Sequence, residues 1–394
     1  MSFPEPELLT SLVSRVFRIE DVTSGDPQKG WILRYRGHLL GDDSAAAYDL
    51  LADSVRVYGL TPLFRKDGDK HVVFLVPSLP EPKKRFPLVN IVLFLLTVFS
   101  VMLAGASPEG TPPADQGAQA LWLLKSIFTG WPFALSLLGI LLAHEFGHYL
   151  MSRYHKTAAT LPFFIPLPFS ILGTMGAFIQ MQAVPKNKRI LFDIGVAGPL
   201  AGMVVAAPVL LFGLTLSHLG PIVQDPNGFI EGNSLLYLFS KYLVFGQLLP
   251  SPASLSGLPL LQYWLQYFFT GHPVPFGGTD VFIHPVAFAG WAGLLVTALN
   301  LIPVGTLDGG HITYALFGEK IRKAYPFILG LLAALGLVWS TWWIWALLLL
   351  WLGRVHAEPL DQITELDPPR RAVGWFAILL FVLVFSPVPM VLLG

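Results

Sequence analysis

The 394-residue chain contains no cysteine, and charged residues make up only 13% of it. Without cysteine, the protein has no disulfide bonds, no thiolate metal ligands and no cysteine nucleophile. Soluble domains carry about 25% charged residues, so the low charge and the 54% hydrophobic content indicate a membrane setting. The net charge is +0, and nothing in it indicates a nucleic-acid partner.

Long hydrophobic runs begin after residue 86, and most approach the ~20 residues that cross a bilayer. The candidate spans are roughly 87–106, 131–153, 190–219, 284–304, 325–339, 341–353 and 373–393. The fifth and sixth predict either a tight hairpin or one interrupted element. The apolar segment Tyr237–Leu249 is too short to span and is expected in the interface. Residues 86–394 are therefore predicted to form an all-α polytopic membrane bundle of about six to seven transmembrane helices.

Residues 1–85 differ from the rest because they are polar and mixed in composition. The pattern predicts helices over Glu5–Phe17 and Asp43–Tyr58, with Asp42 or Asp43 as a cap, and a strand over Gly30–Leu39. Alternating residues on both sides of a Lys-Asp-Gly-Asp turn, Thr61–Arg65 and His71–Val76, predict a hairpin. This region is expected to be a small soluble α+β domain. The first apolar segment starts near Pro87, so no cleavable signal peptide is expected.

Basic residues fall in alternate loops between the spans, which orients the bundle. The basic loops hold Lys83, Lys84, Arg85, Arg153, Lys156, Lys186, Lys188, Arg189, Lys320, Arg322, Lys323, Arg354, Arg370 and Arg371. The loops 107–130 and 220–283 hold only Lys125 and Lys241. The positive-inside rule therefore predicts an integral, multi-pass membrane protein with its N-terminus on the cytoplasmic side.

An HExxH motif, His144-Glu145-Phe146-Gly147-His148, lies inside the apolar stretch Trp131–Leu150. Histidines four residues apart share one helical face and can bind one Zn²⁺, while Glu145 can act as general base on a metal-bound water. The motif also occurs by chance in soluble helices. In hydrocarbon, however, each charged residue costs roughly 2.5 kcal/mol or more, and this cost favours a functional explanation.

A third zinc ligand is expected near the end of the fourth span, at the same depth as the motif. Asp308 is the main candidate, because Pro303 and Gly305 interrupt the helix before it and two glycines follow it. Asp308 could instead cap the next helix. His311 is a rival ligand or a hydrogen-bonding partner of a ligand. Asn300 could donate a hydrogen bond to a developing oxyanion or could be a structural amide.

Two further segments have a physical interpretation. Three prolines, Pro162, Pro166 and Pro168, forbid a regular helix in the apolar segment Leu161–Met181. This segment is expected to form a re-entrant loop or hairpin near the active site, where a free strand edge could bind an unwound substrate; an interfacial loop is the alternative. In the third span, Gly198 and Gly202 form a small-xxx-small face that another helix can approach closely.

The motif His144–His148, followed by Asn300 and by Leu307-Asp308-Gly309, closely resembles the site-2 proteases, which are intramembrane zinc metalloproteases. The segments Phe163–Ile179 and Phe192–Gly202 resemble the family as well, and the branch with plastid and cyanobacterial members is the most similar. The resemblance implies that His144, His148 and Asp308 ligate one zinc ion and that Glu145 is the base. Unlike many members, the chain shows no PDZ or CBS-type module and has Gly305 where they have proline.

The expected function is thus cleavage of transmembrane protein substrates within the lipid bilayer, as in regulated intramembrane proteolysis, with an active site near the cytoplasmic side. The alternative is a catalytically silent membrane binding or transport protein that kept the fold, although such a protein would be expected to lack Glu145. A di-iron oxygenase requires clustered histidine boxes, and the ten histidines are scattered without an HxxHH. A zinc transporter would need further ligands along a crossing path.

Overall fold

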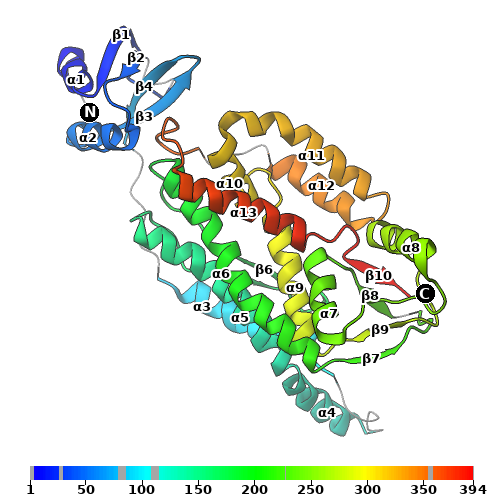
Figure 1. Cartoon of the computed structure of the whole chain (residues 1–394). Helices are drawn as coiled ribbons and strands as arrows, with labels where there is room; N and C mark the ends of the chain where they lie inside the picture. The colour runs from blue at the N-terminus through cyan, green and yellow to red at the C-terminus, as the bar shows by residue number, and fades with distance from the viewer. Residues whose placement is uncertain are drawn as a thin grey trace.

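A computed structural model describes residues 4–25, 30–78, 86–107, 115–226, 228–353 and 358–393 (Figure 1). A small unit containing a sheet lies at one end of an elongated group of helices. The basic residues Lys83, Lys84, Arg85 and Arg354 lie outside the described residues.

The N-terminal unit is an antiparallel sheet with strand order β1-β2-β4-β3 and two helices. The strands are β1 (Phe17–Ser24), β2 (Leu33–Leu39), β3 (Leu60–Asp67) and β4 (Lys70–Pro77), and the helices are α1 (Pro6–Val13) and α2 (Ser44–Arg56). The hairpin β3–β4 and the cap at Asp43 are confirmed. The first helix was predicted to run to Phe17, but it ends at Val13 because Phe17 begins a strand paired with β2.

The N-terminal unit is attached to the helices by a segment far along the chain, residues 359–364, which we call the connector strand. The Phe64 amide of β3 donates to the Leu360 carbonyl over 2.9 Å, and the Gln362 amide donates to the Phe64 carbonyl over 3.1 Å. The Asp361 amide donates to the Lys186 carbonyl over 2.7 Å on the other side. The connector strand therefore extends the sheet at β3 and joins it to the segment that precedes α6.

The helices of the bundle follow in chain order, and α5, α6 and α9 pack together at its centre. They are α3 (Leu88–Ala104), α4 (Gln116–Thr129), α5 (Trp131–Tyr154), α6 (Lys188–Thr215), α7 (Leu235–Phe245), α8 (Gly257–Thr270), α9 (Pro285–Asn300), α10 (Asp308–Phe317), α11 (Ile321–Leu335), α12 (Thr341–Leu352) and α13 (Pro368–Val384), with the 3-10 turn η2 (Gly318–Lys320) between α10 and α11. By length and composition, α5 and α6 could each cross a membrane. The apolar helices α3, α7, α9 and α12 are shorter.

Several predicted spans have different limits in the structure. The last one was predicted over 373–393, but α13 ends at Val384 and is followed by Ser386-Pro387-Val388-Pro389 and the strand β10 (Met390–Leu392). Two prolines close together cannot continue a helix. The residues 325–353 form two separate helices, α11 and α12. The helices α4 and α8 were not anticipated.

Short strands complete the fold. The segment Leu161–Met181 contains a hairpin of β5 (Phe163–Pro166) and β6 (Thr174–Phe178), as the prolines predicted. Two further pairs, β7 (His218–Pro221) with β9 (Thr279–Phe282) and β8 (Phe229–Glu231) with β10, lie at the end of the bundle away from the N-terminal unit (Figure 1).

Candidate active site

Helix α5 carries the HExxH motif in its second half, where the helix is buried against α6 and α9. His144 and His148 lie on one face, one turn apart, and both side chains are buried. Their Nε2 atoms are 3.2 Å apart, so both imidazoles present the same nitrogen to one point in space. This is the arrangement that the i, i+4 spacing predicted.

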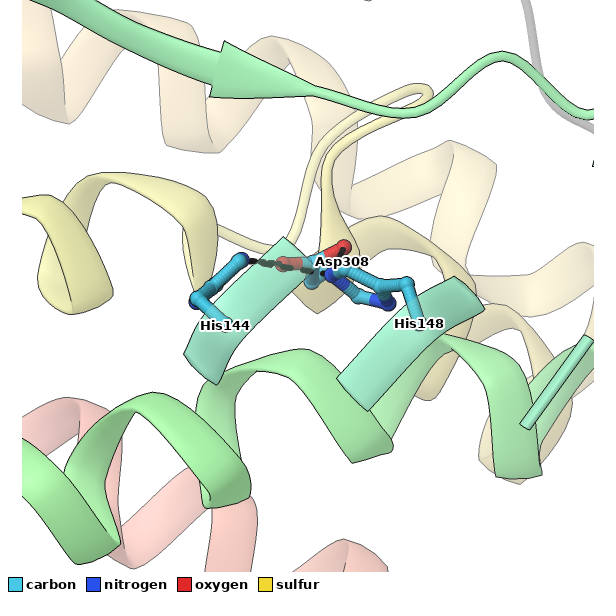
Figure 2. A group of neighbouring side chains, drawn as sticks. All are labelled: His144, His148 and Asp308. Atoms are coloured by element: carbon cyan, nitrogen blue, oxygen red, sulfur yellow. Dashed lines mark hydrogen bonds and ion pairs between the residues drawn. The ribbon is translucent and has the colours of Figure 1, made fainter. Parts of the chain in front are cut away.

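Asp308 reaches the same point from the start of α10 (Figure 2). Its Oδ2 lies 3.2 Å from Nε2 of His144, and its Oδ1 lies 3.3 Å from Nε2 of His148. The alternative in which Asp308 caps α10 is wrong, since Leu307 is the N-cap and the carboxylate points at the two histidines. The backbone around Asp308 depends on glycine: a Cβ at Gly309 would lie 2.0 Å from the Leu301 carbonyl oxygen, and Gly305 has φ +58°.

The three side chains fit a tetrahedral zinc ion. Ligand atoms around an ion with bonds of about 2.0–2.1 Å lie about 3.3–3.4 Å apart. The two histidine Nε2 atoms are 3.2 Å apart, and each lies 3.2 or 3.3 Å from a different oxygen of the Asp308 carboxylate. Two imidazoles and one carboxylate are a donor set that zinc prefers in catalytic sites, which keep one position open. Within the described residues, this trio is the one cluster of at least three potential metal ligands, and it does not include His311.

The ring of His148 is held by a backbone carbonyl, and an amide side chain lies beside the ligand nitrogen of His144. Nδ1 of His148 lies 2.7 Å from the Ile194 carbonyl oxygen of α6. A carbonyl only accepts, so Nδ1 carries the proton and Nε2 keeps its lone pair for a metal. Nδ2 of Asn300, at the end of α9, lies 3.3 Å from Nε2 of His144. Asn300 is thus brought to the site, as the sequence suggested.

Helix α6 covers the histidines with a glycine face. A Cβ at Gly198 would lie 2.0 Å from Nε2 of His148, and a Cβ at Gly202 would lie 3.2 Å from Cβ and Nδ1 of His144. The close helix approach predicted from these glycines is therefore confirmed. His311 packs against the same helix, since a Cβ at Gly195 would lie 2.9 Å from its Cβ.

The Glu145 side chain is buried beside the trio, and its Oε2 has no hydrogen-bond partner within the described part of the chain. The backbone amide of Ile179, just after β6, interacts with the Glu145 carboxylate. Helix α5 and β6 are in contact, and Figure 2 shows a strand with the colour of that region crossing beside the site. The β5–β6 hairpin therefore lies next to the glutamate.

Main-chain groups are the part of the site that sequence reasoning missed. Neither the Ile194 carbonyl nor the Ile179 amide has a side-chain signature. Both lie in segments, Phe192–Gly202 and Phe163–Ile179, that the sequence resemblance had marked.

This arrangement agrees with the family of the chain. Residues 132–335 match peptidase family M50, and the chain belongs to that family, the site-2 proteases. Its relatives are of the plastid type. It is 31% identical over 322 residues to "Probable zinc metalloprotease EGY1, chloroplastic" of Oryza sativa subsp. japonica, covering 76% of this chain and 50% of the relative. It is 29% identical over 388 residues to "Probable zinc metalloprotease EGY2, chloroplastic" of Oryza sativa subsp. indica, covering 93% and 63% respectively.

The EGY1 protein of Arabidopsis thaliana, with the same description, is 30% identical over 321 residues, covering 76% of this chain and 53% of the relative. The chain thus spans about half the length of the EGY1 proteins that it matches. No solved structure matches the chain significantly.

Proposed function

We propose that the protein is an intramembrane zinc metalloprotease that cleaves transmembrane segments of membrane-protein substrates. The observation that carries the proposal is the convergence of His144, His148 and Asp308 beside the buried carboxylate of Glu145. Membership of peptidase family M50 and the printed names of the relatives, zinc metalloproteases, support it.

The chain's own residues divide the chemistry between them. His144, His148 and Asp308 would hold the zinc ion, which when bound activates a water and polarises the scissile carbonyl. Glu145 accepts the proton of that water through its unpartnered Oε2 and passes it to the leaving amine. The amide of Asn300, which already points at Nε2 of His144, donates a hydrogen bond to the developing oxyanion.

Substrate is presented on the β5–β6 hairpin. Strand β6 pairs with β5 on one edge, and its other edge faces α5, as the contact between Ile179 and Glu145 indicates. An unwound stretch of substrate adds to this edge by backbone hydrogen bonds and places its scissile carbonyl beside the three ligands. Because the carbonyls of a helix are already hydrogen-bonded, the substrate helix unwinds locally before it is cut.

The proposed orientation puts the N-terminus and the active-site end in the cytoplasm, with several helices crossing the bilayer. Lys186, which precedes α6, pairs with Asp49 of the N-terminal unit over 2.8 Å, and Arg370 of α13 bonds Asp193 of α6 through two contacts of 2.7 Å. The basic ends of α6 and α13 therefore lie together beside the N-terminal unit, as the positive-inside rule requires of loops on one side. The cut is expected in the cytoplasmic half of the substrate span.

The direct test is Glu145→Gln in the full chain, with a labelled single-span substrate reconstituted in the same vesicles. The amide keeps the size of the side chain but cannot accept the proton, so we expect full zinc content and cleavage reduced roughly 10²–10⁴-fold. Normal turnover by a zinc-loaded variant would show that Glu145 is not the base. A wild-type protein that binds zinc and cuts no membrane-spanning peptide would favour the catalytically silent alternative.

A further inference from the structure

A cluster of ion pairs joins the end of α5, the second turn of α6 and the first turn of α13. Asp193 lies at its centre, with a side chain that is 14% exposed. Nε and Nη2 of Arg370 each donate to a different oxygen of the Asp193 carboxylate over 2.7 Å. Nε2 of His155 lies 2.9 Å from Oδ2 of the same carboxylate. We call these three residues the Asp193 cluster.

The pair formed by Arg370 and Asp193 holds one geometry. A planar guanidinium that donates two parallel hydrogen bonds to one carboxylate fixes its direction as well as its distance, and such charge-assisted bonds are stronger than neutral ones. Arg370 is itself held by Asp367, the N-cap of α13, whose carboxylate accepts from the Arg370 backbone amide over 3.0 Å and from its Nη1. The start of α13 therefore fixes the second turn of α6.

The residue after Asp193 holds a proposed zinc ligand. The Ile194 carbonyl accepts from Nδ1 of His148 over 2.7 Å, which leaves Nε2 of that ring for the metal. Asp193 and Ile194 are consecutive, so a backbone movement at the first moves the carbonyl of the second. Because zinc ligand distances hold to within about 0.2 Å, a small displacement of this carbonyl is enough to turn Nε2 away from the metal position.

The sequence of α6 makes an anchor outside the helix important. Pro199 lies inside α6 and has no amide hydrogen to donate to the Gly195 carbonyl. The first two turns of the helix are therefore joined to the rest by one hydrogen bond fewer than in a regular helix. The glycines Gly195 and Gly198 in the same stretch lower its helix propensity further. Contacts with other elements consequently contribute more to the position of Ile194 than they would in a regular helix.

Helix α5 is attached to α6 at two points. His148 bonds Ile194, and His155, at the end of α5, bonds the adjacent Asp193. The two histidines are seven residues apart, which is about two helical turns, so both face α6. Two attachments on one face resist rotation of α5 about its axis, which would carry the proposed ligands away from Asp308.

We propose that Arg370 and Asp193 are positioning residues for the zinc site, in that their ion pair fixes the Ile194 carbonyl and, through it, the ring of His148. This inference rests on the proposed function, because it takes His148 as a zinc ligand. Neither residue belongs to the ligand trio. The competing interpretation is that the pair only packs α13 against α6, in which case its loss changes the stability of the fold and leaves the metal site as it is.

The test compares Arg370→Gln with Arg371→Gln in the full-length protein in lipid nanodiscs. Arg371 is the matched control, because it is the next residue of α13 and its ion pair, of 3.0 Å, is with the exposed Glu365 before that helix. Zinc affinity is measured by competition with a chelator, and the visible spectrum of the cobalt(II)-loaded protein reports ligand geometry. We expect Arg370→Gln to bind zinc roughly tenfold more weakly or worse, with a changed cobalt spectrum, and Arg371→Gln to match the wild type in both.

Arg370→Lys keeps the test decisive if Arg370→Gln does not fold. Lysine retains the charge but cannot donate two parallel hydrogen bonds, so its zinc affinity should lie between those of the wild type and Arg370→Gln. Wild-type zinc affinity and an unchanged cobalt spectrum in a folded Arg370→Gln variant would overturn the proposal, as would the same result for Arg370→Lys if that is the variant that folds. An equal loss in Arg371→Gln would overturn it as well. A wild-type protein that binds no zinc would refute the proposed function itself.

Discussion

Gly198→Ala is the most informative single change in the bundle, because it adds one methyl group directly over a proposed zinc ligand. The new Cβ would lie 2.0, 2.4 and 2.5 Å from three atoms of the His148 ring. Ordinary contact begins at 3.4 Å, so the ring or α6 has to move by about 1.4 Å. The ring cannot simply rotate away, because its Nδ1 is bonded to the Ile194 carbonyl of the same helix.

The size of the effect follows from how little displacement a metal site tolerates. Ligand distances in zinc sites hold to within about 0.2 Å, so the required movement removes His148 from the coordination shell. Disturbing a group that only orients a ligand already costs about 10–100-fold in metal affinity. We therefore expect zinc affinity at least 100-fold weaker, cleavage lost with it, and overpacking that destabilises the fold by about 1–3 kcal/mol.

Zinc per protein, measured by mass spectrometry after competition with a chelator, is the assay. The matched control is Gly139→Ala on α5, where an added Cβ meets no atom within 4 Å, and this variant should bind zinc normally. Gly202→Ala, with a closest contact of 3.2 Å, should lie between the two. Wild-type zinc affinity and cleavage in Gly198→Ala would refute the close packing of α6 on His148.

Three further changes test other parts of the structure. Asp308→Ala should lose both zinc and cleavage, whereas His311→Ala should keep most of its zinc; metal analysis decides, and zinc loss in the second variant alone would reassign the ligand. Ala177→Pro in β6 should slow cleavage with zinc retained, because proline removes a backbone donor. The control is Phe169→Pro, in the exposed turn of the same hairpin, and equal cleavage rates for the two variants would reject substrate binding on β6. Asp361→Ala should release the connector strand, since the buried Asp361 carboxylate accepts from two backbone amides and two hydroxyls. We expect the free energy of unfolding to fall by about 3 kcal/mol or more, which would appear as faster proteolysis between the N-terminal unit and the bundle. Unchanged proteolysis would contradict this role of Asp361.

The convergence of His144, His148 and Asp308 could be predicted from the sequence because each part of it depends on local geometry. His144 and His148 need only one turn of helix to share a face. Asp308 follows an interruption of the helix that Pro303 and Gly305 predict. The β5–β6 hairpin was predictable for the same reason, since three prolines exclude a helix in an apolar segment.

What could not be predicted depends on how distant elements meet. The position of Gly198 over His148 follows from the rotation of α6 about its own axis, which the sequence pattern of the helix alone does not determine. The strands β8 and β10, of three residues each, are too short to show an alternating pattern. They pair across about half of the bundle sequence, with Met390 opposite Glu231. The ion pair between Lys241 of α7 and Asp280 of β9 arises in the same way, from two separate elements.

The connector strand also determines when the N-terminal sheet can finish folding during synthesis. Arg65 of β3 and its hydrogen-bonding partner Leu360 are separated by 295 residues. At about 5–20 residues per second, a ribosome needs roughly 15–60 seconds to make the second after the first. During that interval β3 is an open sheet edge, which is where unfinished chains aggregate. Two residues of this strand reduce the risk of aggregation until the connector strand has been synthesised. Pro62 has no amide hydrogen to donate, and Lys66 is charged.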